Sequence, residues 1–139
     1  MPEPKTLPAE IVLLVEDEEA VRQATAEFLG LQGYTVLEAK DGLDALSVAK
    51  NHASIIHLVV TDVVMPNMSG GQLSKELAQL RPDTKLLFVS GHAGKTVFDH
   101  NVVDLETNLL QKPYTLKQLS LKIRVALDPN LSVNQLPRG

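Results

Sequence analysis

Short aliphatic runs that alternate with longer segments of helical spacing constrain the fold of this chain more than any other feature. Residues 11–15 and 55–61 are almost wholly apolar and lack the polar alternation of a strand with one face in water. Three further runs, at residues 34–39, 85–89 and 108–111, complete five expected strands. Strands that alternate with helices predict a parallel sheet with helices on both faces.

Apolar residues at helical spacing fill the stretches between these strands. We expect helices over residues 18–31, 41–52, 72–80, 92–101 and 116–127. Asp41 is placed to cap the second helix, and Gly33 to end the first. The side chains of the first two helices that we expect to face the sheet are Val21, Ala24, Phe28, Leu31, Leu43, Leu46 and Val48.

The length of 139 residues fits one domain. Residues 1–9 hold three prolines and are expected to form a flexible leader or linker, residues 10–128 the domain, and residues 129–139 a disordered tail. The chain contains no cysteine, which excludes thiolate metal sites and thiol catalysis and fits a reducing compartment.

Charge and hydropathy exclude two classes of partner. The net charge of −4 argues against direct nucleic-acid binding, whose affinity rests on basic residues. No apolar stretch approaches the roughly 20 residues that span a bilayer, and the N-terminus lacks the pattern of a signal peptide. We therefore expect a cytoplasmic protein that binds neither nucleic acid nor membrane directly.

Polar side chains follow four of the five expected strands. Glu16 and Asp17 follow the first strand, Asp62 the third, Ser90 the fourth and Lys112 the fifth. In open parallel sheets, ligands bind beyond the carboxyl ends of the strands. These residues are therefore the candidate site.

Each of these residues also has an ordinary structural interpretation. Carboxylates suit a helix N-terminus, an aspartate or a Ser-Gly pair suits a turn, and a lysine before proline suits a solvated loop. Together, however, they supply what an aspartyl phosphate requires. Converging carboxylates repel one another unless a cation such as Mg²⁺ joins them. Asp62 then suits a nucleophile that attacks phosphorus, while Lys112 neutralises the phosphoryl charge and Ser90 donates a hydrogen bond.

Four motifs, in this order, resemble those of the receiver domain of two-component response regulators. They are Leu-Leu-Val-Glu-Asp-Glu at residues 13–18, Thr-Asp-Val-Val-Met-Pro-Asn-Met-Ser-Gly at 61–70, Phe-Val-Ser-Gly at 88–91 and Gln-Lys-Pro-Tyr at 111–114. The likeness covers roughly residues 10–127. It implies an α/β, flavodoxin-like (βα)5 three-layer fold with the parallel sheet order 2-1-3-4-5.

The resemblance also implies a role for each candidate. Asp62 would accept phosphate from a histidine kinase or a phosphotransfer histidine, so the chain would be a phosphorelay signalling protein and no stand-alone enzyme. Asp17 and Asp62 would bind Mg²⁺ directly, Glu16 would bind it through water, and Val64 through its main-chain carbonyl. The residues that would act on the phosphoryl group are Asp62, Ser90 and Lys112.

The motifs are most similar to those of receivers attached to hybrid sensor histidine kinases, with one departure. Many receivers carry Phe or Tyr three residues before the lysine, where this chain has Leu109. Leucine cannot swing a ring, so we expect a smaller phosphorylation-linked movement on the face of helix four, strand five and helix five. That face is also the candidate homodimer surface. Val64 and His92, two residues past Asp62 and Ser90, are candidates for controlling phosphate lifetime.

Other functions fit less well. A phosphatase on a similar sheet would carry a second aspartate where this chain has Val64. A flavin-binding domain would need a phosphate-cradling loop after the first strand, where Glu16 and its acidic neighbours repel phosphate. A receiver that serves only as a protein-binding module would not need the chemical groups retained here. His52 and His57 are expected at the surface, and no histidine pair has metal-ligand spacing.

Overall fold

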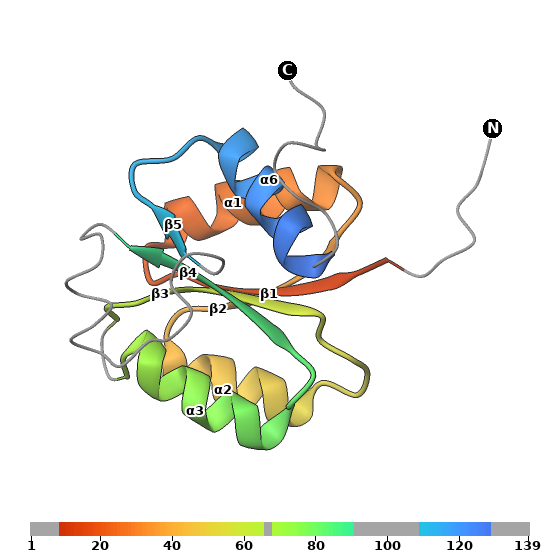
Figure 1. Cartoon of the computed structure of the whole chain (residues 1–139), viewed down its shortest axis with the longest axis vertical. Helices are drawn as coiled ribbons and strands as arrows, with labels where there is room; N and C mark the ends of the chain where they lie inside the picture. The colour runs from red at the N-terminus through yellow and green to blue at the C-terminus, as the bar shows by residue number, and fades with distance from the viewer. Residues whose placement is uncertain (1–8, 66–67, 91–108, 129–139) are drawn as a thin grey trace.

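Five parallel strands form the centre of the protein. The computed structural model describes residues 9–65, 68–90 and 109–128. Within them, the sheet has the order β2-β1-β3-β4-β5 and every neighbouring pair is parallel (Figure 1). This confirms the expected α/β flavodoxin-like architecture. The strands are β1 (Ile11–Val15), β2 (Thr35–Ala39), β3 (Leu58–Asp62), β4 (Lys85–Ser90) and β5 (Leu109–Gln111).

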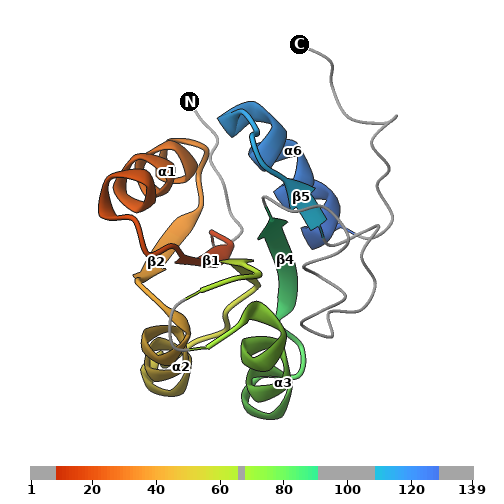
Figure 2. The same ribbon diagram turned by 90° about the vertical axis from the view of Figure 1, so that its left-hand side faces the viewer.

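Helices cover both faces of the sheet. One face carries α1 (Glu19–Leu31) and α6 (Leu116–Leu127), and the other carries α2 (Gly42–Asn51) and α3 (Gly70–Leu80) (Figure 2). None of the described helices is long and apolar enough to cross a membrane. Because the helices cover the two faces of the sheet, the two ends of the strands stay uncovered by them. The carboxyl ends form one edge of the domain, and the amino ends form the opposite edge.

Some expectations fall on residues outside the described ranges. These are the helix at 92–101, which contains His92, the leader at 1–9 apart from Ala9, and the tail at 129–139. The limits of the domain at residues 10 and 128 thus stay predictions.

His57 sets the beginning of β3, which starts at Leu58 and not at residue 55. The main-chain N–H of His57 donates to the Ile11 carbonyl, but its Nδ1 accepts the Ile11 N–H at 2.9 Å. A side-chain acceptor thus replaces the carbonyl that would have continued the parallel ladder. His57 is half-buried in this role, contrary to the surface position expected for it.

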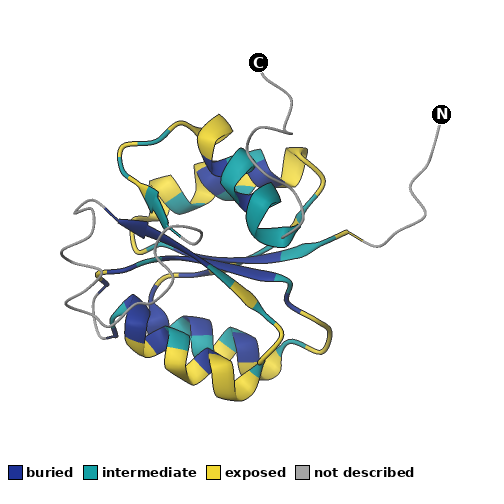
Figure 3. Cartoon of the chain, viewed as in Figure 1, coloured by how far each residue is buried: buried dark blue, intermediate teal, exposed yellow. Residues whose placement is uncertain are grey.

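Both faces of the interior strand β1 are buried, which explains its continuous apolar sequence. Leu13 and Val15 pack toward α2 and α3, whereas Val12 and Leu14 pack toward α1 and α6. Figure 3 shows this burial along the strands, with exposed residues on the outer surfaces of the helices. The sheet is therefore a rigid support for the residues that follow its strands.

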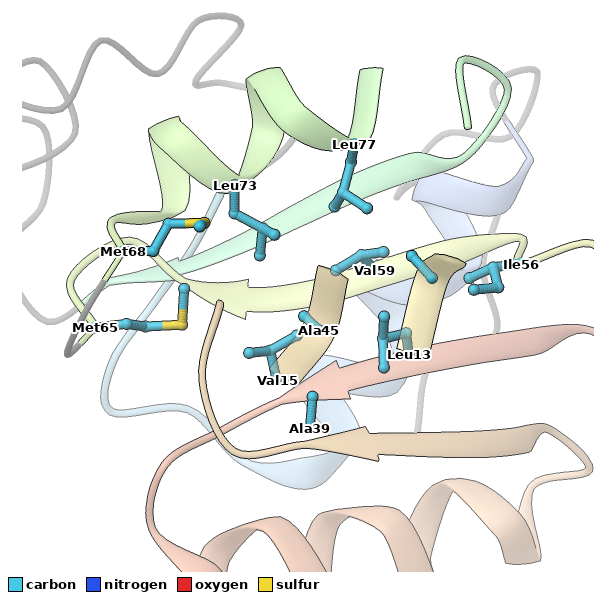
Figure 4. Packing of buried hydrophobic residues seen from close by; sticks show 11 residues of the cluster. Leu13, Val15, Ala39, Ala45, Ile56, Val59, Met65, Met68, Leu73 and Leu77 are labelled. Carbon is cyan, nitrogen blue, oxygen red and sulfur yellow. The ribbon is translucent and has the colours of Figure 1, made fainter. Parts of the chain in front are cut away.

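The packing of α3 on β3 is seen at close range in Figure 4. Leu73 and Leu77 point from the helix toward the sheet, where Val59 lies, and all three are fully or almost fully buried. Burial of a side chain of this size contributes roughly 1.5–3 kcal/mol. This packing fixes α3 on the sheet, and it thereby fixes the end of the segment that connects Asp62 to α3.

The inward faces of α1 and α2 differ in part from those expected. In α1 the fully buried residues are Thr25 and Leu29, and in α2 they include Ala45 and Ala49. Alanines let α2 lie close to the sheet, which leaves Leu43 at the margin with 55% exposure. The expected inward residues that prove to be exposed are Val21, Ala24, Leu31 and Leu43. Those that do pack against the core are Phe28, Leu46 and Val48.

Two helix ends follow the predicted chemistry. The Asp41 carboxylate accepts the Asp44 N–H at 2.8 Å and caps α2. Gly33 has a φ of 101°, in the left-handed region that favours glycine, and stops α1 before β2.

At the edge where the strands begin, α6 is tied to the chain just before β1. The guanidinium of Arg124 donates to both carboxylate oxygens of Glu10, at 3.1 and 3.0 Å, and also to the Tyr34 hydroxyl at 3.4 Å. A bidentate pair of this kind combines charge with fixed geometry. The contact joins the first and last elements of the fold.

Candidate functional site

The carboxyl ends of the strands bring Asp62 and Lys112 into contact. Asp62 pairs with Val89, and Ser90 pairs with Gln111, so the residue after β5 emerges beside the end of β4, one strand away from the end of β3. The Nζ of Lys112 donates to Oδ2 of Asp62 at 2.9 Å. The main-chain N–H of Lys112 donates to the Ser90 carbonyl at 2.8 Å. Strand pairing thus gathers three of the predicted site residues.

Electrostatics hold the Lys112 ammonium on this carboxylate. Burial lowers the pKa of Lys112, but the hydrogen bond and charge of Asp62, with a contribution from Glu16, outweigh burial and raise the pKa overall. The side chains of Lys112 and Asp62 are 40% and 17% exposed. The lysine is therefore cationic at neutral pH, and it lies where an anion on Asp62 would need neutralising. The peptide bond from Lys112 to Pro113 is cis.

Glu16 is the half-buried member of the acidic turn between β1 and α1. Its main-chain N–H donates to the Ala39 carbonyl at 3.0 Å, and its carboxylate accepts the Glu18 N–H at 3.1 Å. Burial raises the pKa of Glu16, and the carboxylates of Asp62 and Asp17 raise it further, against the lowering effect of the Glu18 hydrogen bond. Asp62 and Asp17 thus both contribute to the raised pKa of Glu16.

The oxygen donors at this edge fit Mg²⁺. Among the described residues, no three acidic or histidine side chains surround one point closely enough to hold a metal ion alone. Mg²⁺ needs no such cage, because it binds through one or two carboxylates and keeps several waters. Burial is the main reason for the raised pKa of Glu16, and the negative charge of Asp62 adds to it; a divalent cation would offset both effects by favouring the ionised carboxylates. Asp17, Asp62 and Glu16 are the residues that would hold it.

The remaining predicted site residues lie around this centre. Ser90 is buried at the end of β4, and Val64, two residues past Asp62, is 54% exposed. Leu109 packs against Phe88 and Val63 in a small cluster beside the site. His92 lies outside the described residues.

The absence of a side chain at Gly70 allows the start of α3 to pack closely against the backbone of Asp62 and Val63. A Cβ on Gly70 would lie 2.7 Å from the Asp62 carbonyl oxygen, 2.9 Å from the Val63 Cα and 3.3 Å from the Phe88 ring. Its N–H donates to the Val63 carbonyl at 2.7 Å. The start of α3 is therefore pressed against the backbone that carries Asp62.

A pocket beside the site was not anticipated from the sequence. It has a volume of about 750 Å³ and lies between α1 and the chain from β5 into α6. Glu16 and Lys112 border both this pocket and the Asp62 centre. Val21 and Ala24 of α1 line this pocket, although they were expected to face the sheet. Apolar residues outside the buried stripe of α1 were thus the sequence signal for the pocket. The apolar lining residues are Ala20, Val21, Ala24, Pro113 and Leu116.

Comparison with known proteins agrees with this geometry. The family model described as response regulator receiver domain matches residues 12–124. The chain is 42% identical over 117 residues to the sensor kinase CckA of Brucella abortus, covering 84% of this chain but only 12% of that protein. The response regulator receiver protein CpdR of the same organism is 28% identical over 84% of this chain and 95% of its own length.

Solved structures give the same result. The crystal structure of the receiver domain from the hybrid histidine kinase CckA matches with a TM-score of 0.70 and 35% identity, over 85% of this chain and 99% of that one. The expected likeness to receivers of hybrid kinases is thereby confirmed. The family consists of phosphate-accepting regulators and not of classical enzymes. The chain belongs to the response regulator receiver domain family of two-component signalling.

Proposed function

We propose that Asp62 accepts a phosphoryl group from a histidine kinase or a phosphotransfer histidine, with Mg²⁺ as cofactor, and that the domain signals through the resulting conformational shift. The observation that carries this proposal is the 2.9 Å contact between Lys112 and Asp62 at the edge where Glu16 also lies. A cytoplasmic location is part of the proposal, in keeping with a chain that has no cysteine.

In the transfer step, a carboxylate oxygen of Asp62 forms a bond to phosphorus as the bond from phosphorus to the donor imidazole nitrogen breaks. The imidazole leaves with that electron pair. The Lys112 ammonium, which contacts Asp62, would donate to a phosphoryl oxygen, and the hydroxyl of Ser90, at the end of the neighbouring strand β4, would donate to another. Asp17 and Asp62 would hold Mg²⁺ directly, Glu16 through water and Val64 through its main-chain carbonyl, and the bound ion would neutralise further phosphoryl charge.

The pocket between α1 and α6 supports a docking site for the helix that carries the donor histidine. It shares Glu16 and Lys112 with the site, so a helix seated there would present an imidazole toward Asp62. Val21 and Leu116 offer exposed apolar contacts of the kind that receive the apolar face of an amphipathic helix. A homodimer through the face of the expected helix four, β5 and α6 is a separate prediction, which analytical ultracentrifugation with and without beryllofluoride would test.

Val64 belongs to the proposal as a control on phosphate lifetime. Its half-exposed side chain flanks Asp62 and would hinder the water that hydrolyses the aspartyl phosphate. Replacement of Val64 by a smaller or a charged residue should therefore change the dephosphorylation rate while phosphorylation itself persists. His92, two residues past Ser90 in the sequence, has the same proposed role.

Intact mass spectrometry tests the central claim. Incubation with Mg²⁺ and acetyl phosphate should add one phosphoryl group to the wild-type protein and none to Asp62→Asn. Asp83→Asn is a matched control, because Asp83 is an exposed turn residue, and it should be phosphorylated normally. An adduct that persists in Asp62→Asn, or no adduct and no beryllofluoride binding in the wild type, would refute the proposal.

A further inference from the structure

Arg22 connects the acidic turn to two other elements. It lies in the first turns of α1, and its side chain is 17% exposed. Its Nη1 donates to the main-chain carbonyl of Glu16 at 2.9 Å, and its Nε lies 3.3 Å from Oε1 of Glu38 on β2. One guanidinium thus joins the chain that leaves β1 to the neighbouring strand.

Both main-chain polar groups of Glu16, its N–H and its carbonyl, are therefore hydrogen-bonded. Its N–H is bound by the Ala39 carbonyl of β2, and its carbonyl is bound by Arg22. Because the peptide groups before and after Glu16 are both fixed, the backbone direction into Asp17 is fixed as well. The planar guanidinium suits this task, since it can donate in two directions at once.

We infer that Arg22 is a positioning residue for the Mg²⁺ site at Glu16, Asp17 and Asp62, an inference that rests on the proposed function. Mg²⁺ demands near-ideal octahedral geometry, so loosely held carboxylates bind it less well. Loss of a residue that orients metal ligands typically costs about 10–100-fold in metal affinity. Within the described part of the chain, the guanidinium of Arg22 bonds to the Glu16 carbonyl and the Glu38 carboxylate, neither of which is a proposed metal ligand atom. It acts through the main chain of Glu16.

The alternative is that Arg22 forms only a surface ion pair with Glu38. Exposed pairs contribute little to stability, and such a pair would leave metal affinity unchanged. The two alternatives therefore differ in Mg²⁺ affinity and not in folding. Arg124 offers a matched comparison, because it is also a helix arginine paired with a glutamate, at the opposite edge of the sheet.

Titration of the apo protein with MgCl₂ alone, followed by amide chemical shifts, tests the inference. Arg22→Ala should weaken Mg²⁺ binding about 10-fold or more, and Arg22→Lys should restore part of it. Arg124→Ala should bind Mg²⁺ like the wild type. Unchanged affinity in Arg22→Ala, or an equal loss in Arg124→Ala, overturns the inference.

Two further variants distinguish a failure of the Arg22 inference from misfolding of Arg22→Ala and from a failure of the proposed function. If Arg22→Ala does not fold, Glu38→Ala decides the matter, because it retains the arginine but removes its anchor. That variant should weaken Mg²⁺ binding about threefold, part of the loss typical of orienting residues, and an unchanged affinity contradicts the inference. Failure of the wild type to bind Mg²⁺, with Asp62→Asn as reference, would instead refute the proposed function.

Discussion

The ammonium of Lys112 donates to the carboxylate of Asp62 across 2.9 Å, although 50 residues separate the two in the sequence. The pairing of β3 with β4 and of β4 with β5 makes this contact, since each strand end is placed by its neighbour. The carboxylate is mostly buried and the lysine partly exposed. In the proposed function, this arrangement would provide the nucleophile with a counter-charge that also neutralises the phosphoryl group once it is attached.

Replacing Lys112 should therefore impair chemistry more than folding. For Lys112→Met we expect phosphorylation by acetyl phosphate to slow about 10²-fold, the effect of removing one donor from a transition-state anion. The melting temperature should change little, because a partly exposed ion pair contributes at most about 1 kcal/mol. Lys117→Met, on the exposed side of α6, is the control and should react at the wild-type rate. A wild-type rate in Lys112→Met would contradict the assigned role.

Two glycines should respond in opposite directions to the same substitution. In Gly70→Ala the new Cβ meets backbone atoms of Asp62 and Val63, which cannot move aside, and unfolding should become easier by about 1–3 kcal/mol. In Gly30→Ala the Cβ enters open space on a helix, and stability should increase by about 0.4–1 kcal/mol. Urea unfolding of both variants measures the difference. Equal effects would show that the backbone around Asp62 yields more readily than the geometry implies.

Leu109 should limit the response of the β5 surface to phosphorylation. It packs on Phe88 and Val63 but has no ring to rotate between inner and outer positions. We therefore expect beryllofluoride with Mg²⁺ to shift amide signals strongly around Asp62 and Lys112 and only weakly along β5 and α6. Leu109→Phe should enlarge the response of that face. Large shifts across β5 and α6 in the wild type would refute this expectation.

Tyr34 predicts a loss of stability in alkaline solution. Burial raises the pKa of the Tyr34 phenol above its ordinary value of 10.0, Arg124 lowers it, and Glu10 raises it again, with a net increase. The native state therefore keeps a proton that the unfolded state releases, so unfolding becomes easier as pH rises from about 10 through the raised pKa.

Comparison with Tyr34→Phe isolates this contribution. At about pH 8 the free energy of unfolding of the variant should be about 0.5–1 kcal/mol lower than that of the wild type, because the hydrogen bond from Arg124 to the Tyr34 hydroxyl is lost. This difference should shrink or reverse at about pH 11. Denaturant unfolding at both pH values provides the measurement. A deficit that stays constant with pH would mean that Tyr34 titrates alike in the folded and unfolded states.

The centre of the site was predictable because its residues follow buried strands. An apolar run identifies a strand, parallel strands end at one edge, and the polar residue that follows each run must lie there, as Asp62 and Lys112 do. Helix faces were less predictable. Val21 and Leu43 belong to helical apolar patterns, but Thr25 and the alanines of α2 pack inward, because shape and close approach decide which stripe faces the sheet.

Contacts between polar side chains and the main chain could not be predicted from the pattern of apolar and polar residues in the sequence. Arg22 reaches the Glu16 carbonyl, and the imidazole of His57 takes the place of a carbonyl at the start of β3. Both interactions depend on the three-dimensional path of the backbone. Neither residue type nor spacing distinguishes them from solvated surface residues.

The ion pair of Arg124 with Glu10 also determines how the domain can be connected to other modules. It holds the approach to β1 and the last turns of α6 together at the edge where strands begin, opposite the carboxyl edge with Asp62. A fluorescent reporter or an affinity handle fused before residue 9 or after residue 128 is thus attached behind the reactive edge. Tethering of this kind would leave the carboxyl ends of the strands open to the proposed phosphodonor.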